Sequence, residues 1–285
     1  MAAGQGSDAS RGAPRGISFA PPEPGSRPER RKARLARLPA PERRYGVLFM
    51  PRSSSSRLTA IAKGAGLGTP GEFLNPELMP AMVAALGSAS MAEHEATLLR
   101  RFSDAGAVWG IEVTPRHVRG SYGDLAALSE AFGIDRWAWL VRRDIAAQAV
   151  SAVRMSATGL AHDDGTGAPP APARLPYRPR AIARAVLRLL WMERMGEAMV
   201  RRLERPPLRL SYEGLTAMSE AQVAAGLADW LGLPPPSAVE GAQHRRLPPA
   251  GHAERFCASN RLFMRAVGAA RARTLRALPD APFGS

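Results

Sequence analysis

Short apolar runs alternate with helix-spaced apolar positions along the chain. Continuous apolar runs are typical of buried parallel strands, and apolar residues three or four positions apart are typical of amphipathic helices. Gly66, Gly133 and Gly232 each follow a helical stretch and predict its end. The predicted strands are Tyr45–Met50, Ala107–Val113, Trp137–Val141 and Leu208–Tyr212, and the predicted helices cover about 58–65, 77–104, 125–132, 144–159, 182–203, 219–231 and 252–277.

Strands that alternate with helices predict an α/β fold with a mostly parallel central sheet flanked by helices in three layers. Residues 1–44 are rich in Gly, Pro, Ser, Ala and Arg without apolar periodicity, and are expected to form a disordered basic tail. The folded domain is expected over 45–285. Within it, the Pro-rich residues 161–179 predict a mobile loop or lid.

Composition narrows the class of protein. Cys257 is the only cysteine, and the five histidines are scattered, so neither a disulfide framework nor a metal site is expected. A reducing, cytoplasmic setting fits this cysteine usage. No run is long and apolar enough for a membrane span.

The net charge of +14 leaves two interpretations open. It fits an arginine-rich solvated surface, and it fits a polyanionic partner such as a nucleotide, a nucleic acid or an anionic lipid. The basic tail lacks aromatic interleaving and amphipathic spacing, so nucleic acid and membrane are the less favoured partners.

A polar loop follows the first predicted strand. This loop, the serine loop, reads Pro51-Arg52-Ser53-Ser54-Ser55-Ser56-Arg57-Leu58. A strand that enters such a loop and then a helix creates an anion site, because the first helical N–H groups are unpaired and the helix dipole favours negative charge there. The Lys of a nucleotide-hydrolysing phosphate loop is absent, which argues against a kinase or ATPase. Taken alone, the loop also fits an ordinary Ser-capped helix start.

Five segments together resemble the bacterial trehalose 2-sulfotransferase family, which is grouped with lipopolysaccharide and Nod-factor sulfotransferases. The serine loop looks like that family's RSGST loop, and four further segments agree in order and spacing. These are Gly68-Thr69-Pro70-Gly71-Glu72-Phe73, Val108-Trp109-Gly110, Arg142-Arg143-Asp144 with Gln148-Ala149-Val150-Ser151, and Leu210-Ser211-Tyr212-Glu213-Gly214-Leu215.

The resemblance implies a P-loop-type fold and a sulfotransferase that uses 3′-phosphoadenosine 5′-phosphosulfate (PAPS) as co-substrate, without a metal. It implies that the loop grips the 5′-phosphosulfate, that Arg142 and Ser151 hold the 3′-phosphate, and that Tyr212 lies near the adenine. Arg142 also fits a surface ion pair with Asp144. The donor-binding residues implied in this way are Arg52, Ser53, Ser54, Ser55, Ser56, Arg142, Ser151 and Tyr212.

Glu72 and Arg52 are the candidate catalytic residues. The resemblance makes Glu72 the general base that takes the proton of the acceptor hydroxyl, and Arg52 would stabilise charge on the leaving phosphate. Glu72 also fits a loop carboxylate that caps the next helix. The acceptor implied by the family is a carbohydrate or a glycolipid.

Two residues depart from the family's pattern. Ser54 replaces a Gly, which reduces the conformational freedom of the loop, and Glu112 stands where trehalose-type members have a Lys, in a region expected to touch the acceptor. An inactive member that only binds a nucleotide or polyanion therefore stays as the alternative. The helix over 182–203, which carries Trp191, is a candidate for core packing or for a homodimer face.

Overall fold

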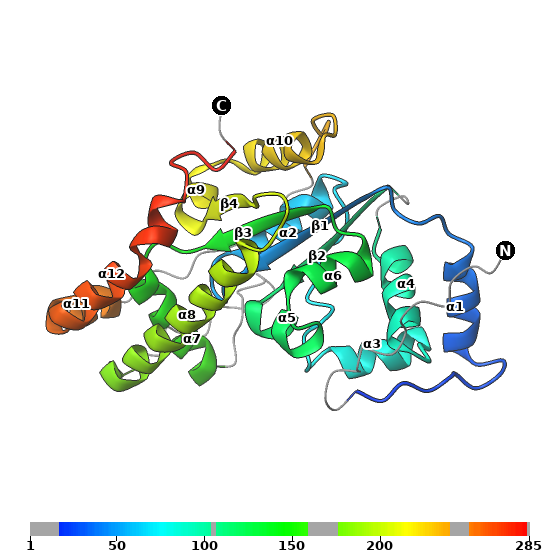
Figure 1. Ribbon diagram of the computed structural model, residues 1–285, viewed down its shortest axis with the longest axis horizontal. Helices are drawn as coiled ribbons and strands as arrows, with labels where there is room; N and C mark the ends of the chain where they lie inside the picture. Colours follow the sequence, from blue (N-terminus) through cyan, green and yellow to red (C-terminus); the bar gives the residue numbers. More distant parts are fainter. Residues whose placement is uncertain (1–16, 104–106, 159–175, 240–250, 284–285) are drawn as a thin grey trace.

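The computed structural model describes residues 17–103, 107–158, 176–239 and 251–283. Across these ranges, one sheet of parallel strands runs through the molecule in the order β2-β1-β3-β4 (Figure 1). All four predicted strands are present, and the predicted parallel α/β class is confirmed. The strands are β1 (Arg43–Phe49), β2 (Val108–Val113), β3 (Arg136–Val141) and β4 (Leu208–Ser211).

Both faces of the sheet are buried. Successive side chains of each strand point to opposite sides, so each strand contributes to two apolar clusters. Leu48 and Trp139 belong to one apolar cluster, and their neighbours Val47 and Leu140 belong to another. Since each cluster continues into helices, the sheet is the middle of three layers. This arrangement accounts for the continuous apolar character of the strand segments.

Few helices cover the face that carries Val47. In Figure 1, α10 lies above the sheet, and its Val223 and Leu227 share a cluster with Leu58 and Ile61 of α2. The helices whose buried residues join this cluster are α2 (Ser55–Gly64), α9 (Tyr212–Ala217) and α10 (Glu220–Leu231).

The opposite face carries the larger cluster, which extends from Leu35 to Leu278. The helices on this side are α1 (Arg27–Ala36), α3 (Met79–Leu86), α4 (Met91–Arg101), α5 (Pro115–Ser121), α6 (Leu125–Phe132), α7 (Ile145–Thr158), α8 (Pro179–Val200), α11 (His252–Ser259) and α12 (Arg261–Arg276).

Helix ends follow the predicted local signals. Gly133 and Gly232 end α6 and α10 in the left-handed conformation, with φ of 62° and 70°. Before α10, the Ser219 hydroxyl accepts the Gln222 N–H at 3.2 Å, and the Gln222 side chain accepts the Ser219 N–H at 2.9 Å. These two hydrogen bonds form a capping box at this helix start.

Some expected elements differ from the structure. The expectation of a disordered tail over 1–44 was wrong for residues 27–36, which form α1: its Leu35 is buried, and Ser26 caps its start. The helix expected over 77–104 is divided into α3 and α4 at Gly87, which has φ of 66°. Most of the predicted lid at 161–179 lies outside the described residues.

Helix α8 uses its apolar stripe mainly for the core. Met192 and Met199 are buried, whereas Leu187 and Trp191 are 53% and 51% exposed. No helix in the described ranges has the length and apolar character required to cross a membrane.

Candidate active site

The serine loop joins β1 to α2 at the carboxyl edge of the sheet, where ligands bind in parallel α/β folds. Two of its non-glycine residues adopt positive φ: Arg52 at 67° and Ser54 at 70°. Ser54 precedes the first residue of α2 and lies in the left-handed region, where a glycine would be unstrained. The family's glycine at this position therefore has a direct conformational reason.

Hydrogen bonds within the loop and from α7 hold its backbone. The buried Ser53 hydroxyl donates to the Met50 carbonyl at 2.6 Å. Gln148, 1% exposed on α7, donates its side-chain amide to the Pro51 carbonyl at 2.7 Å. Ser53 thus shapes the loop itself, and Gln148 ties the loop to the helix that carries Ser151.

Arg52 and Ser151, two predicted donor-binding residues 99 positions apart, are in contact. The Arg52 Nε donates to the Ser151 Oγ at 3.0 Å, and its Nη1 lies 3.7 Å from the Met155 sulfur. Burial lowers the pKa of the Arg52 guanidinium, and the nearby positive charge of Arg142 lowers it further. Two guanidinium groups brought this close favour a bound anion between them.

Arg142 extends from the end of β3 across the ring of Tyr212, with its guanidinium carbon 4.1 Å from the ring centroid. Its Nη1 lies 3.4 Å from the Arg52 carbonyl. Its Nε is buried and has no hydrogen-bond partner in the described structure. A buried N–H without a partner costs about 1–3 kcal/mol, and an anionic oxygen would satisfy it.

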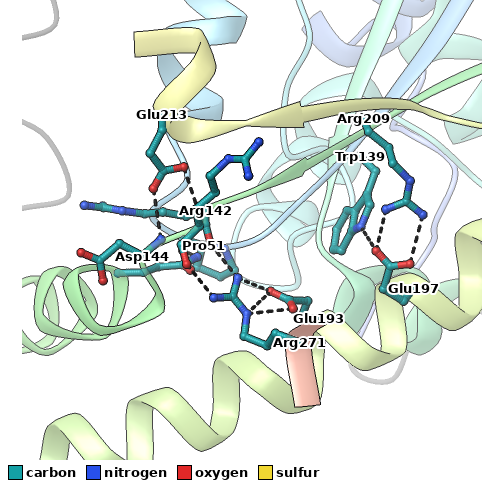
Figure 2. A network of polar contacts seen from close by, with 11 residues as sticks. Pro51, Trp139, Arg142, Asp144, Glu193, Glu197, Arg209, Glu213 and Arg271 are labelled. Carbon is teal, nitrogen blue, oxygen red and sulfur yellow. Dashed lines mark hydrogen bonds and ion pairs between the residues drawn. The ribbon is translucent and has the colours of Figure 1, made fainter. Parts of the chain in front are cut away.

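The turn between β3 and α7, which carries Arg142, is held from two sides (Figure 2). From the side of α9, the Glu213 carboxylate accepts the N–H groups of Arg143 at 3.0 Å and Asp144 at 3.1 Å. From the other side, Arg271 of α12 donates to the carbonyls of Arg142 at 2.6 Å and Arg143 at 2.7 Å. Asp144 accepts the Ala147 N–H at 2.8 Å, so it caps α7.

Carboxyl groups lie on the β2 side of the loop. Glu112 of β2 is 5% exposed, accepts the Thr59 hydroxyl of α2, and is also hydrogen-bonded by Ser55. Its backbone N–H donates to the Gly71 carbonyl at 2.9 Å, which places Glu72 beside it. The Glu112 carboxyl group lies beneath the start of α2, and the expectation that its region touches an acceptor stays a prediction.

Both of these carboxyl groups are shifted toward the neutral form. Burial and the charge of nearby Glu72 raise the pKa of Glu112 to about 8. Burial also raises the pKa of Glu72, whose Oε2 accepts the Asn75 side-chain amide at 3.2 Å. Glu112 is buried and Glu72 is half-buried, and two neighbouring carboxyl groups resist double ionisation because each disfavours a negative charge on the other.

The structure therefore places the predicted residues in two groups. Arg52, Arg142, Ser151 and Tyr212 meet on the β3–β4 side, while Glu72 is linked to Ser55 through Glu112 on the β2 side. Ser54 and Ser56 occupy the start of α2 between them. Arg57 donates to the carbonyls of Leu215 at 2.6 Å and Met218 at 3.1 Å, so it supports α9.

Sequence reasoning missed Glu193 and Arg271, which form a buried ion pair between α8 and α12 at 2.7 Å. A signal was present. Glu193 and Glu197 interrupt the apolar stripe of α8, and Arg271 lies on the same face of α12 as Val267 and Thr274. Charged residues at such positions indicate buried partners, but their spacing does not name the partner.

Comparison with protein-family models matches residues 115–248 to the Stf0 sulphotransferase family. The matched segment is less than half of the chain. It contains Arg142, Ser151 and Tyr212, and it excludes the serine loop and Glu72. The match supports a sulfotransferase family and indicates a transferase.

A sulfotransferase domain from the curacin biosynthetic pathway is among the similar solved structures. It shares 15% sequence identity, the alignment covers 78% of this chain and 98% of that chain, and the TM-score is 0.42. No curated protein matches this chain.

Proposed function

We propose that this chain transfers the sulfuryl group of PAPS to a hydroxyl group of a carbohydrate or glycolipid acceptor. The observation that carries the proposal is the buried Arg142 Nε, which has no partner in the described structure and lies beside the Arg52–Ser151 contact at the start of α2. Such a site fits a ligand with two separate anionic groups. The family match over residues 115–248 supports sulfuryl transfer as the reaction.

Each group of residues has a task in this proposal. The start of α2 and Arg52 bind the 5′-phosphosulfate, since helix N–H groups and a guanidinium both favour an anion. Arg142 and Ser151 bind the 3′-phosphate, and the Tyr212 ring lies beside the adenosine. The Arg142–Tyr212 stack supports this placement, because it orients the guanidinium before the donor binds.

Glu72 acts as the general base in this proposal. The acceptor oxygen attacks sulfur, the bond between sulfur and the phosphate oxygen breaks, and Glu72 takes the hydroxyl proton. The products are a sulfate ester and 3′,5′-adenosine bisphosphate. Burial raises the pKa of Glu72, which brings a carboxylate closer to the basicity that proton transfer needs at neutral pH.

Sulfate transfer from labelled PAPS into a cell extract, with mass identification of the product, tests this function. Glu72→Gln is expected to lower the transfer rate by about 10²- to 10⁴-fold, as for other general bases, without changing nucleotide affinity. Asn75→Ala, which removes the amide that contacts Glu72 together with the Oδ1 that accepts the Glu77 N–H at 3.1 Å, is the control and should lower the rate far less.

The alternative is an inactive member of the same fold that binds a nucleotide or a polyanion. The strained Ser54 and the buried Glu112 beneath the loop favour it. It predicts nucleotide binding with no transfer into any extract and no effect of Glu72→Gln. Stabilisation by ATP with Mg²⁺ but not by 3′,5′-adenosine bisphosphate would contradict the proposed sulfotransferase.

A further inference from the structure

Arg271 is the most heavily bonded buried side chain around the β3–α7 turn. It is 2% exposed, and its guanidinium contacts one carboxylate and two backbone carbonyls at once. Its Nε donates to Glu193 at 2.9 and 3.0 Å, and its Nη2 lies 2.7 Å from the Glu193 Oε2. The guanidinium also donates to two backbone carbonyls, from Nη2 to the Arg142 oxygen at 2.6 Å and from Nη1 to the Arg143 oxygen at 2.7 Å.

These carbonyls belong to the residues that end β3. Glu213 fixes the N–H groups of the same turn, so both polar sides of the peptide units at 143 are bonded. Fixing the peptide planes fixes the direction in which the Arg142 side chain leaves the backbone. The hydrogen bonds of Arg271 therefore act on the strand end from which the Arg142 side chain leaves, while the Arg271 guanidinium itself contacts the two carbonyls and Glu193 (Figure 2).

A second ion pair on α8, between Glu197 and Arg209, offers a comparison. Glu197, one turn after Glu193, pairs with Arg209 at 2.8 and 3.1 Å and accepts the Trp139 indole N–H at 2.7 Å. That pair joins α8 to the sheet and contacts no residue of the donor site. Both pairs join a glutamate of α8 to an arginine. They differ in their further hydrogen bonds: Arg271 also donates to two carbonyls of the β3–α7 turn, whereas Glu197 also accepts from Trp139.

Stability is a weak reason for either pair, since burying two charges costs about as much as their attraction returns. The gain from Arg271 is geometric: one rigid, planar fork spans a carboxylate and two carbonyls. A lysine with a single ammonium group cannot reproduce that span.

We propose that Arg271, held by Glu193, is a positioning residue that sets Arg142 for the 3′-phosphate of the donor. The inference rests on the proposed function. It makes α12 part of the donor site, although this helix lies outside the residues matched by the family model.

The test uses the full chain and two nucleotides, 3′,5′-adenosine bisphosphate and 5′-AMP, with affinities measured by titration calorimetry. The double variant Glu193→Leu/Arg271→Met removes both charges together, so neither is left buried without its partner. We expect its affinity for the bisphosphate to fall by about 10- to 100-fold, as for a binding group displaced by about 1 Å. Its affinity for 5′-AMP, which has no 3′-phosphate, should change by less than about threefold, well below the loss expected for the bisphosphate.

The matched control is Glu197→Leu/Arg209→Met on the same helix, which should keep both affinities. A double variant at 193 and 271 that folds and still prefers the bisphosphate as the wild type does would overturn the inference. A wild type without any preference for the bisphosphate would instead contradict the proposed function. If the double variant does not fold, Arg271→Lys decides: it keeps a charge for Glu193, and a preserved preference would exclude positioning by the fork.

Discussion

The two flanks of the serine loop have opposite charges and are held in different ways. On the β3–β4 flank, Arg142 stacks on Tyr212, and its turn is fixed by charged side chains from α9 and α12. On the β2 flank, Glu112 is held by hydroxyl groups, and among the described residues no cation forms an ion pair with it. The basic flank is therefore held in place by several contacts, while Glu112 on the acidic flank changes charge with pH.

This difference suggests that the two flanks govern different steps, donor binding on one side and proton transfer on the other. Donor affinity should depend on the basic flank, because anion binding needs donors in fixed positions. The transfer step should depend on the acidic flank, because proton transfer needs a carboxylate that titrates near neutral pH. Substitutions on the two flanks should consequently change different measured quantities.

The largest expected effect on donor affinity belongs to the basic flank. Arg142→Ala should weaken binding of 3′,5′-adenosine bisphosphate by about 10- to 100-fold, since each hydrogen bond to a charged group contributes about 1.5–3 kcal/mol. Titration calorimetry measures this loss. Arg143→Ala is the control, because the Arg143 side chain donates to the carbonyls of Leu278 at 3.5 Å and Pro279 at 3.0 Å instead. An equal loss of bisphosphate affinity in both variants would contradict a specific contact between Arg142 and the 3′-phosphate.

On the acidic flank the expected effect is a dependence of stability on pH. The folded pKa of Glu112, about 8, exceeds its ordinary value of 4.5, so between these values the folded chain retains a proton that the unfolded chain has released. This contribution to stability is complete below about pH 4.5 and is lost as the pH rises to about 8, by at most about 1.4 kcal/mol per pH unit. Glu112→Gln should abolish that loss.

Thermal unfolding at pH 5 and pH 8.5 measures the difference, at about 2–4 °C for each kcal/mol. Wild type should lose more of its melting temperature over this range than Glu112→Gln. Glu77→Gln, which removes an exposed carboxylate near Glu72, should retain the wild-type slope. Parallel curves for wild type and Glu112→Gln would mean that Glu112 is already ionised in the fold.

The smallest effect concerns the loop between the flanks. Ser54→Gly should stabilise the protein by up to about 1 kcal/mol, because glycine adopts φ of 70° without the strain that serine suffers there. Ser56→Gly, inside α2, should instead destabilise the protein by about 0.5–1 kcal/mol. Denaturant titration distinguishes the two. Loss of stability in both variants would show that Ser54 contributes a contact that outweighs its strain.

The sheet and the loop could be predicted because their signals are local. Most strand residues lie in short apolar runs, and the serine loop follows directly from the first of them. Because all strands are parallel, their carboxyl ends bring Arg52, Arg142 and Tyr212 to the same edge, as the segment order implied.

The remaining features depend on tertiary contacts that local patterns do not contain. Arg271 and Glu193 are 78 positions apart, and only the packing of α12 on α8 brings them together. Helix α1 was missed because most of its residues are polar, and its burial rests on Leu35. The position of Glu112 beneath α2 depends on the register of β2 against β1, where it lies beside Val47.

Arg271 recognises main-chain carbonyls, and every amino acid supplies the same carbonyl group. The hydrogen bonds from Arg271 therefore do not depend on which side chains occupy positions 142 and 143. A change at 142 would alter the group presented to the donor while the strand end keeps its path. Position 142 is thus a suitable place to redesign which anion the protein binds, with the scaffold around it left unchanged.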